Sequence, residues 1–483
     1  MNIIHYFLLS LLYFWASSTA LSLGVGYYTV YRPVIAGFLT GLILKDPFVG
    51  MTAGAVVNII YIDFVSTGGS FKGDQCLTAI IAAIAASLLK LSPIEAAASA
   101  YPFGFLGILI WKYRLNINSV FVKIYENKYE MAKRGIEKRY PDISIYDGLF
   151  PQLILYFMST AVILAAVFIM ILFYDFIVSI KESLFFIGLF LVFVATWNII
   201  YKLNNKKSTL IFIVALILTF IINPKSYIVF IAAGIIVSIL ANKKLLFNNY
   251  SKTDNEGKIN KKDLMYSWFI WMNFSHSCYS YERLQGMAFA HSMKNIFKKL
   301  YESPEDIALA VHKHSEHFNT EPNMGTPIHG HIISLEEKLE VTNENNILFI
   351  KKGMMGIAAG LGDSYTQVVL TPLFISMSLM LCLDNSFTLS LIPIAALAFT
   401  ILIISYSGFM QGYYEGKESL IERINIIKNS RVKKYFPFIF AGILGVSLGK
   451  LLMLDVHVES LTLHAFIGII SVAYATYKNR SSK

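Results

Sequence analysis

Long apolar runs separated by short polar segments dominate the chain. The runs Gly148–Tyr174, Ser183–Tyr201 and Ser386–Ser405 carry almost no charge. A helix needs about 20 such residues to cross the hydrocarbon core of a bilayer, so each run is long enough. Apolar residues follow one another instead of alternating with polar ones, which argues against membrane strands. The pattern predicts an all-α, polytopic membrane protein.

Composition and charge agree with this prediction. The 483 residues are 55% hydrophobic and 15% charged, whereas soluble domains carry about 25% charged residues. The net charge is +10. Because the basic residues lie mostly between the apolar runs, we attribute this charge to the positive-inside rule and not to nucleic-acid binding. The three cysteines, Cys76, Cys278 and Cys382, are far apart and indicate neither disulfides nor a zinc site.

The N-terminus has an apolar core followed by small residues, as a signal peptide does. It lacks a basic leading region, and apolar character resumes at Gly24–Val30. We therefore expect a first membrane helix here, with a cleavable signal peptide as the alternative.

Two apolar segments are interrupted by glycine and followed by an acid. In the second half, Lys351–Gln367 contains four glycines and Asp363. In the first half, Arg32–Ala98 consists of short pieces rich in Gly, Ala and Pro, and the stretch GGSFKGD ends at Asp74. Irregular backbone at membrane depth occurs only where it is buried in protein or lines a cavity. Both segments are expected to contain broken or re-entrant helices.

Broken helices at matching places in two halves are typical of a transporter binding site. A carboxylate within such a segment marks a functional site. We therefore predict that Asp74 and Asp363 bind the hydroxyl groups of a polyhydroxylated solute. Two structural alternatives stay open. The glycines can serve close helix packing, and the carboxylates can satisfy backbone amides at the tip of a re-entrant turn.

The polar parts of the chain divide it further. Trp111–Asp147 is basic and partly amphipathic, which places it on the cytoplasmic face. Asn242–Asp263 is polar, carries charges of both signs and has the composition of a linker. Leu264–Ile347 is mixed polar and aromatic, typical of amphipathic helices near the membrane surface. Sustained hydrophobicity returns at Leu348.

Several motifs resemble the membrane components of the mannose-type phosphotransferase system. Those that resemble the IID component are SYERLQGMAF at Ser280–Phe289, EHFNTEP at Glu316–Pro322, GHIISLEE at Gly330–Glu337 and IKKGMMGIAAGLGDS at Ile350–Ser364. Those that resemble the IIC component are RPVIAG at Arg32–Gly37 and the glycine-rich run Gly54–Asp74.

The resemblance implies a fusion of the two components in a multi-pass protein of the inner (cytoplasmic) membrane. Residues 1–242 are then IIC-like, 243–263 a linker and 264–483 IID-like, with amphipathic helices over 264–347 and a membrane part over 348–483. The halves are expected to intertwine and to form a homo-oligomer, typically a trimer, in membrane lipid. The protein is expected to translocate a hexose or amino sugar, which a separate phosphorylated IIB (IIAB) protein phosphorylates. The phosphorylated residue lies on that partner, so whether this chain is itself an enzyme stays open.

Candidate binding residues follow from the broken segments and the motifs. They are Asn58, Ser66, Gly69, Asp74, Ser280, Gln285, Gly356, Gly360 and Asp363. Glu282 and Arg283 are expected to form a structural ion pair, and Asp63 to pair with Lys72. No cofactor or metal is expected.

Two alternatives stay open for the function. Asn58, Asp63 and Ile357 depart from the family's motifs, which allows a phosphotransferase-independent or degenerate transporter or receptor with the same fold. The histidines between His312 and His331 raise the possibility of a metalloenzyme. Their spacing does not match that of common metal sites, and the HExxH motif is absent.

Overall fold

The computed structural model describes residues 2–18, 20–62, 73–222, 234, 257–338, 344–384, 386–455 and 461–481. Within these ranges the chain folds into helices and forms no strand. Five helical segments are long and apolar enough to cross a membrane: Ile145–Leu172, Lys181–Lys202, Ile347–Leu383, Thr388–Glu415 and Arg431–Met453. The bent pair Pro93–Ala100 and Phe103–Lys133 adds a sixth if it is counted as one span. These segments confirm the predicted all-α, polytopic membrane protein.

The first half begins with short helices and continues with long ones. Its elements are α1 (Ile3–Ser17), η1 (Gly26–Tyr28), α2 (Pro33–Leu44), α3 (Pro47–Ile60), α4 (Gln75–Leu88), α5 (Pro93–Ala100), α6 (Phe103–Lys133), η2 (Ile145–Leu149), α7 (Phe150–Leu172), α8 (Tyr174–Ser179), α9 (Lys181–Lys202) and α10 (Lys206–Ile222). The region expected to consist of interrupted pieces thus forms four short helices, α2 to α5.

Glycines bring α2 and α3 into close contact. A Cβ on Gly37 would lie 2.3 Å from Gly50 O, and one on Gly54 would lie 2.3 Å from Pro33 O. Only glycine allows the two backbones to approach this far. The packing alternative therefore explains the glycines of this pair.

The second half combines a cluster of amphipathic helices with a membrane part. Its elements are α13 (Lys261–Phe274), α14 (Gly286–Leu300), α15 (Pro304–His314), α16 (Thr326–Glu337), α17 (Glu344–Gly362), η3 (Asp363–Leu370), α18 (Thr371–Leu383), α19 (Phe387–Glu415), α20 (Glu418–Lys428), α21 (Arg431–Asp455) and α22 (Leu461–Ser481). The amphipathic cluster, α13 to α16, packs around the buried rings of Trp271, Phe289 and Phe297.

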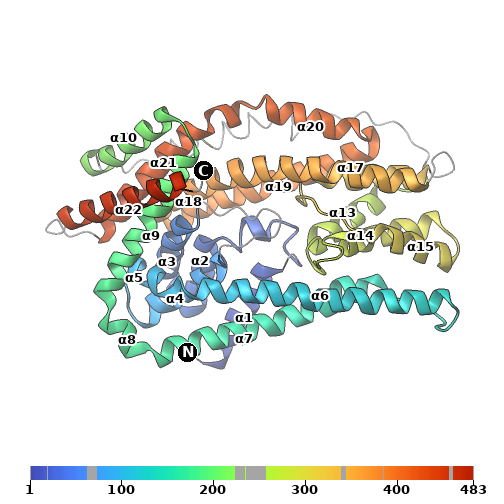
Figure 1. The fold of residues 1–483 in the computed structure, drawn as a ribbon, viewed down its shortest axis with the longest axis horizontal. Coiled ribbons are helices and arrows are strands. Elements are labelled where there is room, and N and C mark those ends of the chain that lie inside the picture. Colours follow the sequence, from blue (N-terminus) through green and yellow to red (C-terminus); the bar gives the residue numbers. More distant parts are fainter. Residues whose placement is uncertain are drawn as a thin grey trace.

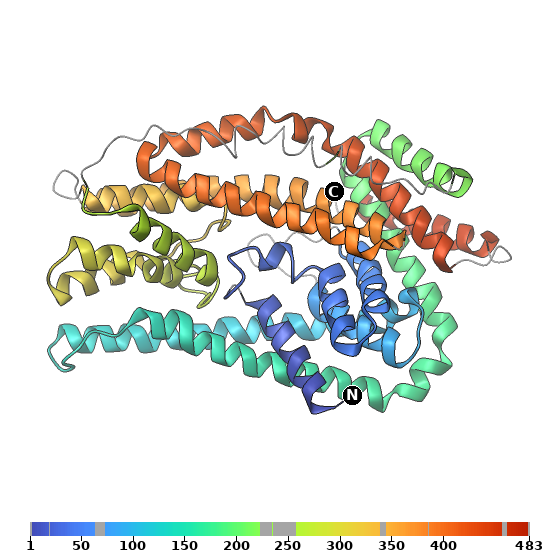
Figure 2. The same ribbon diagram turned by 180° about the vertical axis from the view of Figure 1, so that it is seen from behind.

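Long helices frame the molecule on two sides. Helices α6 and α7 run along one side, and α17 and α19 along the other (Figure 1). Seen from behind, α2 to α5 lie between these two sides toward one end, and α13 to α15 toward the other (Figure 2). Contacts between the two halves include those of α10 with α21 and of α9 with α22.

The glycine-rich segment of the second half, Lys351–Gln367, is helical throughout. The prediction of a broken or re-entrant helix in this segment is therefore wrong. Helix α17 continues through the π-helical segment η3 into α18, and the three form one candidate span, Ile347–Leu383. Glycine within a helix is unfavourable by only about 0.5–1 kcal/mol relative to alanine, too little to force a turn in a membrane helix whose backbone must form its own hydrogen bonds. The irregularity is the wider π-helical turn that begins at Asp363. Such π-helical segments are frequent at functional sites.

Candidate functional site

A cavity of about 400 Å³ lies between the two halves. The first half contributes the end of α1, residues around η1 and part of α6; the second contributes the loops 275–284 and 319–323 and the junction of α17 with η3. This volume lies within the range of small-molecule binding sites. The cavity is the candidate functional site.

Aromatic rings form one side of the cavity. The rings of Tyr27 and Tyr31 stack with their centroids 5.3 Å apart. Trp111 on α6 and Tyr279 in the 275–284 loop also line the space, and Tyr279 Oη donates a hydrogen bond to Asn319 Oδ1 at 3.1 Å. Such walls offer flat apolar surfaces with polar groups at their edges.

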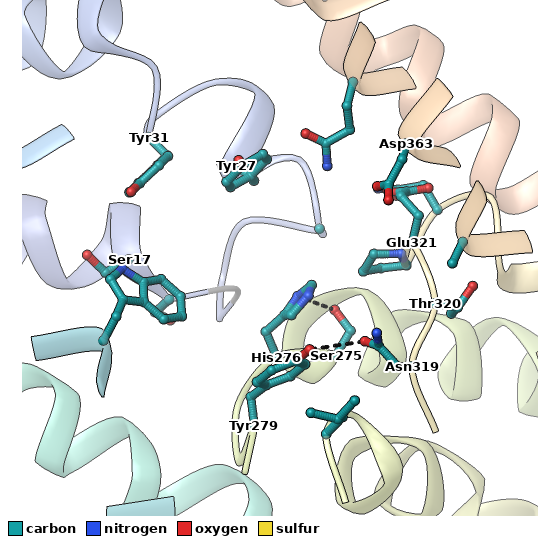
Figure 3. Close-up of a pocket in the computed structure, with 18 of the residues that line it drawn as sticks. Ser17, Tyr27, Tyr31, Ser275, His276, Tyr279, Asn319, Thr320, Glu321 and Asp363 are labelled. Atoms are coloured by element: carbon teal, nitrogen blue, oxygen red, sulfur yellow. Dashed lines mark hydrogen bonds between the residues drawn. The ribbon is translucent and has the colours of Figure 1, made fainter. Parts of the chain in front are cut away.

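Two carboxylates, Glu321 and Asp363, occupy another side. Figure 3 shows their side chains next to each other, with Tyr27 and Tyr31 toward one side of the view and His276 and Tyr279 toward another. Asp363 is half-buried at the first position of η3. Among the described residues it has no hydrogen-bond or ion-pair partner. The structure thus places the predicted Asp363 in the cavity.

Glu321 is held in position by three donors. Its Oε1 accepts hydrogen bonds from Tyr28 Oη at 2.7 Å and from Asn323 Nδ2 at 3.0 Å, and its Oε2 accepts one from Met324 N at 2.7 Å. The side chain lies against Gly362, where a Cβ would be 2.2 Å from Glu321 Cβ. Tyr28 belongs to the first half and Glu321 to the second, so this hydrogen bond joins the two halves at the cavity.

Gln285 supports the cavity without lining it. Its Oε1 accepts from Thr320 N at 2.9 Å, and its Nε2 donates to Thr320 O at 3.0 Å and contacts His276 Nε2 at 3.1 Å. The predicted Gln285 therefore fixes two lining loops relative to each other. Ser280 is buried nearby and accepts from Arg283 N at 3.3 Å; it does not line the cavity.

Helix α6 holds the 275–284 loop through polar contacts. Arg114 Nη2 donates to His276 O at 2.7 Å, and Asn118 Nδ2 donates to Tyr279 O at 2.8 Å. These contacts fasten a loop of the second half to a helix of the first.

The prediction that Glu282 and Arg283 form an ion pair with each other is wrong. Glu282 instead accepts a hydrogen bond from Ser119 Oγ at 2.6 Å, and Arg283 pairs with Glu126 and bonds Ser315. Both side chains extend from a tight turn toward partners on other elements, so the adjacent charges do not meet.

Asp74 lies outside the cavity. It is fully buried, and its Oδ1 accepts from Cys76 N at 3.0 Å and Leu77 N at 2.9 Å, which caps the N-terminus of α4. Its Oδ2 accepts from Tyr13 Oη at 2.5 Å. The geometry matches the structural alternative, a carboxylate that satisfies backbone amides.

We expect Asp74→Asn to lower stability more than ligand affinity. The change weakens a helix cap, at about 0.5–2 kcal/mol, and a hydrogen bond to a charged group, at about 1.5–3 kcal/mol. Thermal unfolding of the purified protein should show a lower midpoint, and equilibrium binding of the transported solute should change less than about threefold. A loss of affinity at unchanged thermal stability would contradict the capping role.

The other predicted residues do not line the cavity or lie outside the described part. Asn58 is buried in α3, and its Oδ1 has no hydrogen-bond partner among the described residues. No atom of a neighbouring element lies within 4 Å of a Cβ built on Gly356 or Gly360. Ser66, Gly69, Asp63 and Lys72 lie outside the described residues.

Several cavity residues were not predicted from the sequence. Glu321 lies within the EHFNTEP motif, and Tyr27 and Tyr31 lie in the aromatic stretch just before the RPVIAG motif. Gln367, one turn after Asp363, also lines the cavity, and its buried Oε1 has no partner among the described residues. A motif shows that Glu321 is distinctive, but only the fold shows that it faces Asp363.

The histidines of the second half have separate partners. His314 contacts Glu336 Oε1 at 2.8 Å, His329 contacts Ser267 and Ser292, and His312 stacks on Tyr129. Burial lowers the pKa of His314 to about 4 and that of His329 to about 3, so both are neutral near pH 7. Within the described ranges, no three potential metal ligands come together. This arrangement does not favour the metalloenzyme alternative.

Two family models match the chain in succession. Residues 3–241 match the model described as the PTS system sorbose-specific IIC component. Residues 258–461 match the model described as the PTS system mannose/fructose/sorbose family IID component.

Individual relatives match part of the second half. Identity is 31% over 162 residues with the sorbose-specific EIID component of Lacticaseibacillus casei, which covers 33% of this chain and 57% of the relative. Identity is 31% over 172 residues with the fructose permease IID component of Bacillus subtilis (strain 168), and the match covers 35% of this chain and 62% of the relative. Identity is 29% over 171 residues with the mannose-specific EIID component of Escherichia coli (strain K12), and the match covers 34% of this chain and 60% of the relative. The chain thus covers less than two thirds of each of these relatives.

A solved structure also shows similarity. The cryo-EM structure of the mannose transporter ManYZ in complex with microcin E492 is 28% identical and covers 42% of this chain and 73% of the matched chain, with a TM-score of 0.32.

Proposed function

Because the chain belongs to the mannose/fructose/sorbose family of phosphotransferase-system membrane components, with a IIC region and a IID region in one polypeptide, we propose that it is a sugar permease. The sugar binds in the cavity between the two regions. The observation that supports this most is the composition of the cavity, which combines aromatic residues of both regions with two carboxylates of the IID region. We place the boundary at a linker over residues 243–263, of which 243–256 lie outside the described residues.

The cavity has the groups that a hexose or an amino sugar requires. Carboxylate oxygens of Glu321 and Asp363 accept hydrogen bonds from hydroxyl or amino groups, and Asn319 and Gln367 supply amide donors and acceptors. The apolar face of the sugar ring packs against Tyr27 or Trp111. Recognition by a few placed polar groups on an apolar wall is the usual design of such sites.

Transport is coupled to phosphorylation by a separate IIB protein that carries a phosphohistidine. The basic surface of α6 and the polar surface of α13 to α16 are the faces on which IIB docks. The C-terminal part of α6 carries Lys123, Lys128 and Lys133, which supports a cytoplasmic position for this end by the positive-inside rule. We further propose that the protein resides in the inner membrane as a homo-oligomer, the trimer that the resemblance implies.

Uptake of radiolabelled sugar tests the coupling directly. Cells that express this chain with its cognate IIA and IIB proteins should accumulate labelled mannose, fructose or sorbose as the sugar phosphate. Cells that lack IIA and IIB should accumulate none. Uptake that is indifferent to IIA and IIB would contradict the proposal and support a phosphotransferase-independent transporter with this fold.

A further inference from the structure

The two carboxylates of the cavity differ in their surroundings. The lone pairs of Glu321 face three donors, Tyr28 Oη, Asn323 Nδ2 and Met324 N. The residue is 4% exposed. Hydrogen bonds to a charged carboxylate are stronger than those to a neutral acid, so a proton added to Glu321 would weaken all three. Glu321 is therefore suited to accept hydrogen bonds from a ligand, and not to take up a proton.

Asp363, unlike Glu321, has no donor hydrogen-bonded to its carboxylate among the described residues. It is only half-buried, it lines the cavity, and within the described part of the chain nothing donates a hydrogen bond to it. Its position at the start of the π-helical segment η3 directs it beside Glu321 (Figure 3). A proton can bind to it without breaking an existing contact.

The remaining charged and titratable groups at the cavity are less suited to take up a proton. His276 Nε2 already contacts Gln285 Nε2 at 3.1 Å. The ammonium group of Lys112 has hydrogen-bond donors but no acceptor. The tyrosines of the cavity are phenols, which already carry a proton near neutral pH. Asp363 is therefore the best-placed proton acceptor in the cavity.

Phosphorylation of a sugar hydroxyl requires a proton acceptor. A hydroxyl oxygen attacks phosphorus and must lose its proton, and a positioned base contributes about 10²–10⁴-fold to such steps. Protein kinases use an aspartate for this purpose.

We propose that Asp363 accepts the proton of the sugar hydroxyl during phosphoryl transfer, which rests on the proposed function of the chain as a phosphotransferase permease. The sugar O–P bond forms as the P–N bond of the donor phosphohistidine breaks. The electron pair of that bond stays on the ring nitrogen, and the ring leaves as neutral imidazole because its second nitrogen carries a proton. Asp363 later releases the hydroxyl proton to solvent. Glu321 positions the sugar and exchanges no proton.

Separate measurement of binding and transfer tests the proposal. Membranes that contain wild type, Asp363→Asn or Asp363→Glu receive phosphoenolpyruvate and soluble extract of the source cells as the phosphoryl source. Sugar phosphate formed from labelled mannose, fructose or sorbose is measured, and equilibrium binding of the same sugar is measured without the extract. Asp175→Asn on α8 is the matched control, because it makes the same change at an exposed position outside the cavity and outside the proposed docking faces.

We expect Asp363→Asn to bind sugar no more than about tenfold more weakly than wild type, because its amide oxygen still accepts a hydrogen bond. We expect it to form sugar phosphate at least about 100-fold more slowly. Asp363→Glu should recover part of the rate, and Asp175→Asn should match wild type. Transfer by Asp363→Asn at the wild-type rate would overturn the proposal, and so would a loss of binding as large as the loss of transfer. Failure of wild type itself to form sugar phosphate would instead contradict the proposed function.

Discussion

Replacement of Glu321 by glutamine is expected to reduce sugar uptake at least about 100-fold, equivalent to about 3 kcal/mol. The amide keeps the shape of the side chain but turns one acceptor oxygen into a donor. That donor then faces Met324 N, or else Tyr28 Oη and Asn323 Nδ2. An unpaired buried donor is unfavourable by about 1–3 kcal/mol, and loss of a hydrogen bond to a charged group by about 1.5–3 kcal/mol. Initial rates of labelled-sugar uptake measure the effect.

Tyr28→Phe is the milder counterpart of this change. It removes one of the three donors to Glu321 and leaves the carboxylate in place. We expect a reduction of about tenfold in uptake, because one hydrogen bond to a charged group is lost. If Glu321→Gln and Tyr28→Phe both transported at the wild-type rate, the cavity would not be the transport site.

Replacement of Gly330 by alanine is expected to destabilise the fold by about 3 kcal/mol or more, at the upper end of overpacking effects. A Cβ at this position would lie 2.0 Å from Phe409 O on α19. The opposing Gly412 is equally constrained, since its Cβ would lie 2.0 Å from Pro327 O on α16. Because both obstacles are backbone atoms, side-chain repacking cannot relieve them. The yield of folded protein in membranes, measured by fluorescence-detected size exclusion, should fall at least about tenfold.

Gly356→Ala is the matched control for this prediction. No neighbouring atom lies within 4 Å of the added Cβ, and the residue lies inside a helix. Alanine is favoured over glycine there by about 0.5–1 kcal/mol. Yield and uptake should stay within about twofold of wild type. A similar loss of yield in both variants would show that helix packing within the chain is not what constrains Gly330.

Hydropathy was sufficient to predict the class of fold. Uninterrupted apolar runs such as Ser183–Tyr201 correspond to candidate spans, because backbone groups in a bilayer must form their hydrogen bonds within the segment. The short pieces of Arg32–Ala98 also correspond to the short helices α2 to α5. The prediction of a break around Gly356 is wrong, because glycine alone does not interrupt a membrane helix whose backbone groups must form their hydrogen bonds within the segment.

The candidate site was only partly predictable. Asp363 was identified because a carboxylate within an apolar segment is unusual. Asp74 was identified on the same ground, yet it caps α4. Sequence cannot separate these two cases, because capping and ligand binding both place a carboxylate at a helix terminus or irregularity.

Glu321 and the aromatic walls depend on contacts between distant parts of the chain. Tyr28 and Glu321 are 293 positions apart and meet only because the two halves pack against each other. A single sequence contains no signal for such a pair. The short motif around Glu321 indicates that the residue is distinctive but not which cavity it faces.

A structure of the protein with bound sugar, determined by cryo-EM in lipid nanodiscs, tests the central claim most directly. We predict sugar density in the cavity between the IIC and IID regions, within hydrogen-bond distance of Glu321 and Asp363 and against the ring of Tyr27 or Trp111. Sugar density elsewhere, for example against Asp74, with this cavity empty would contradict it.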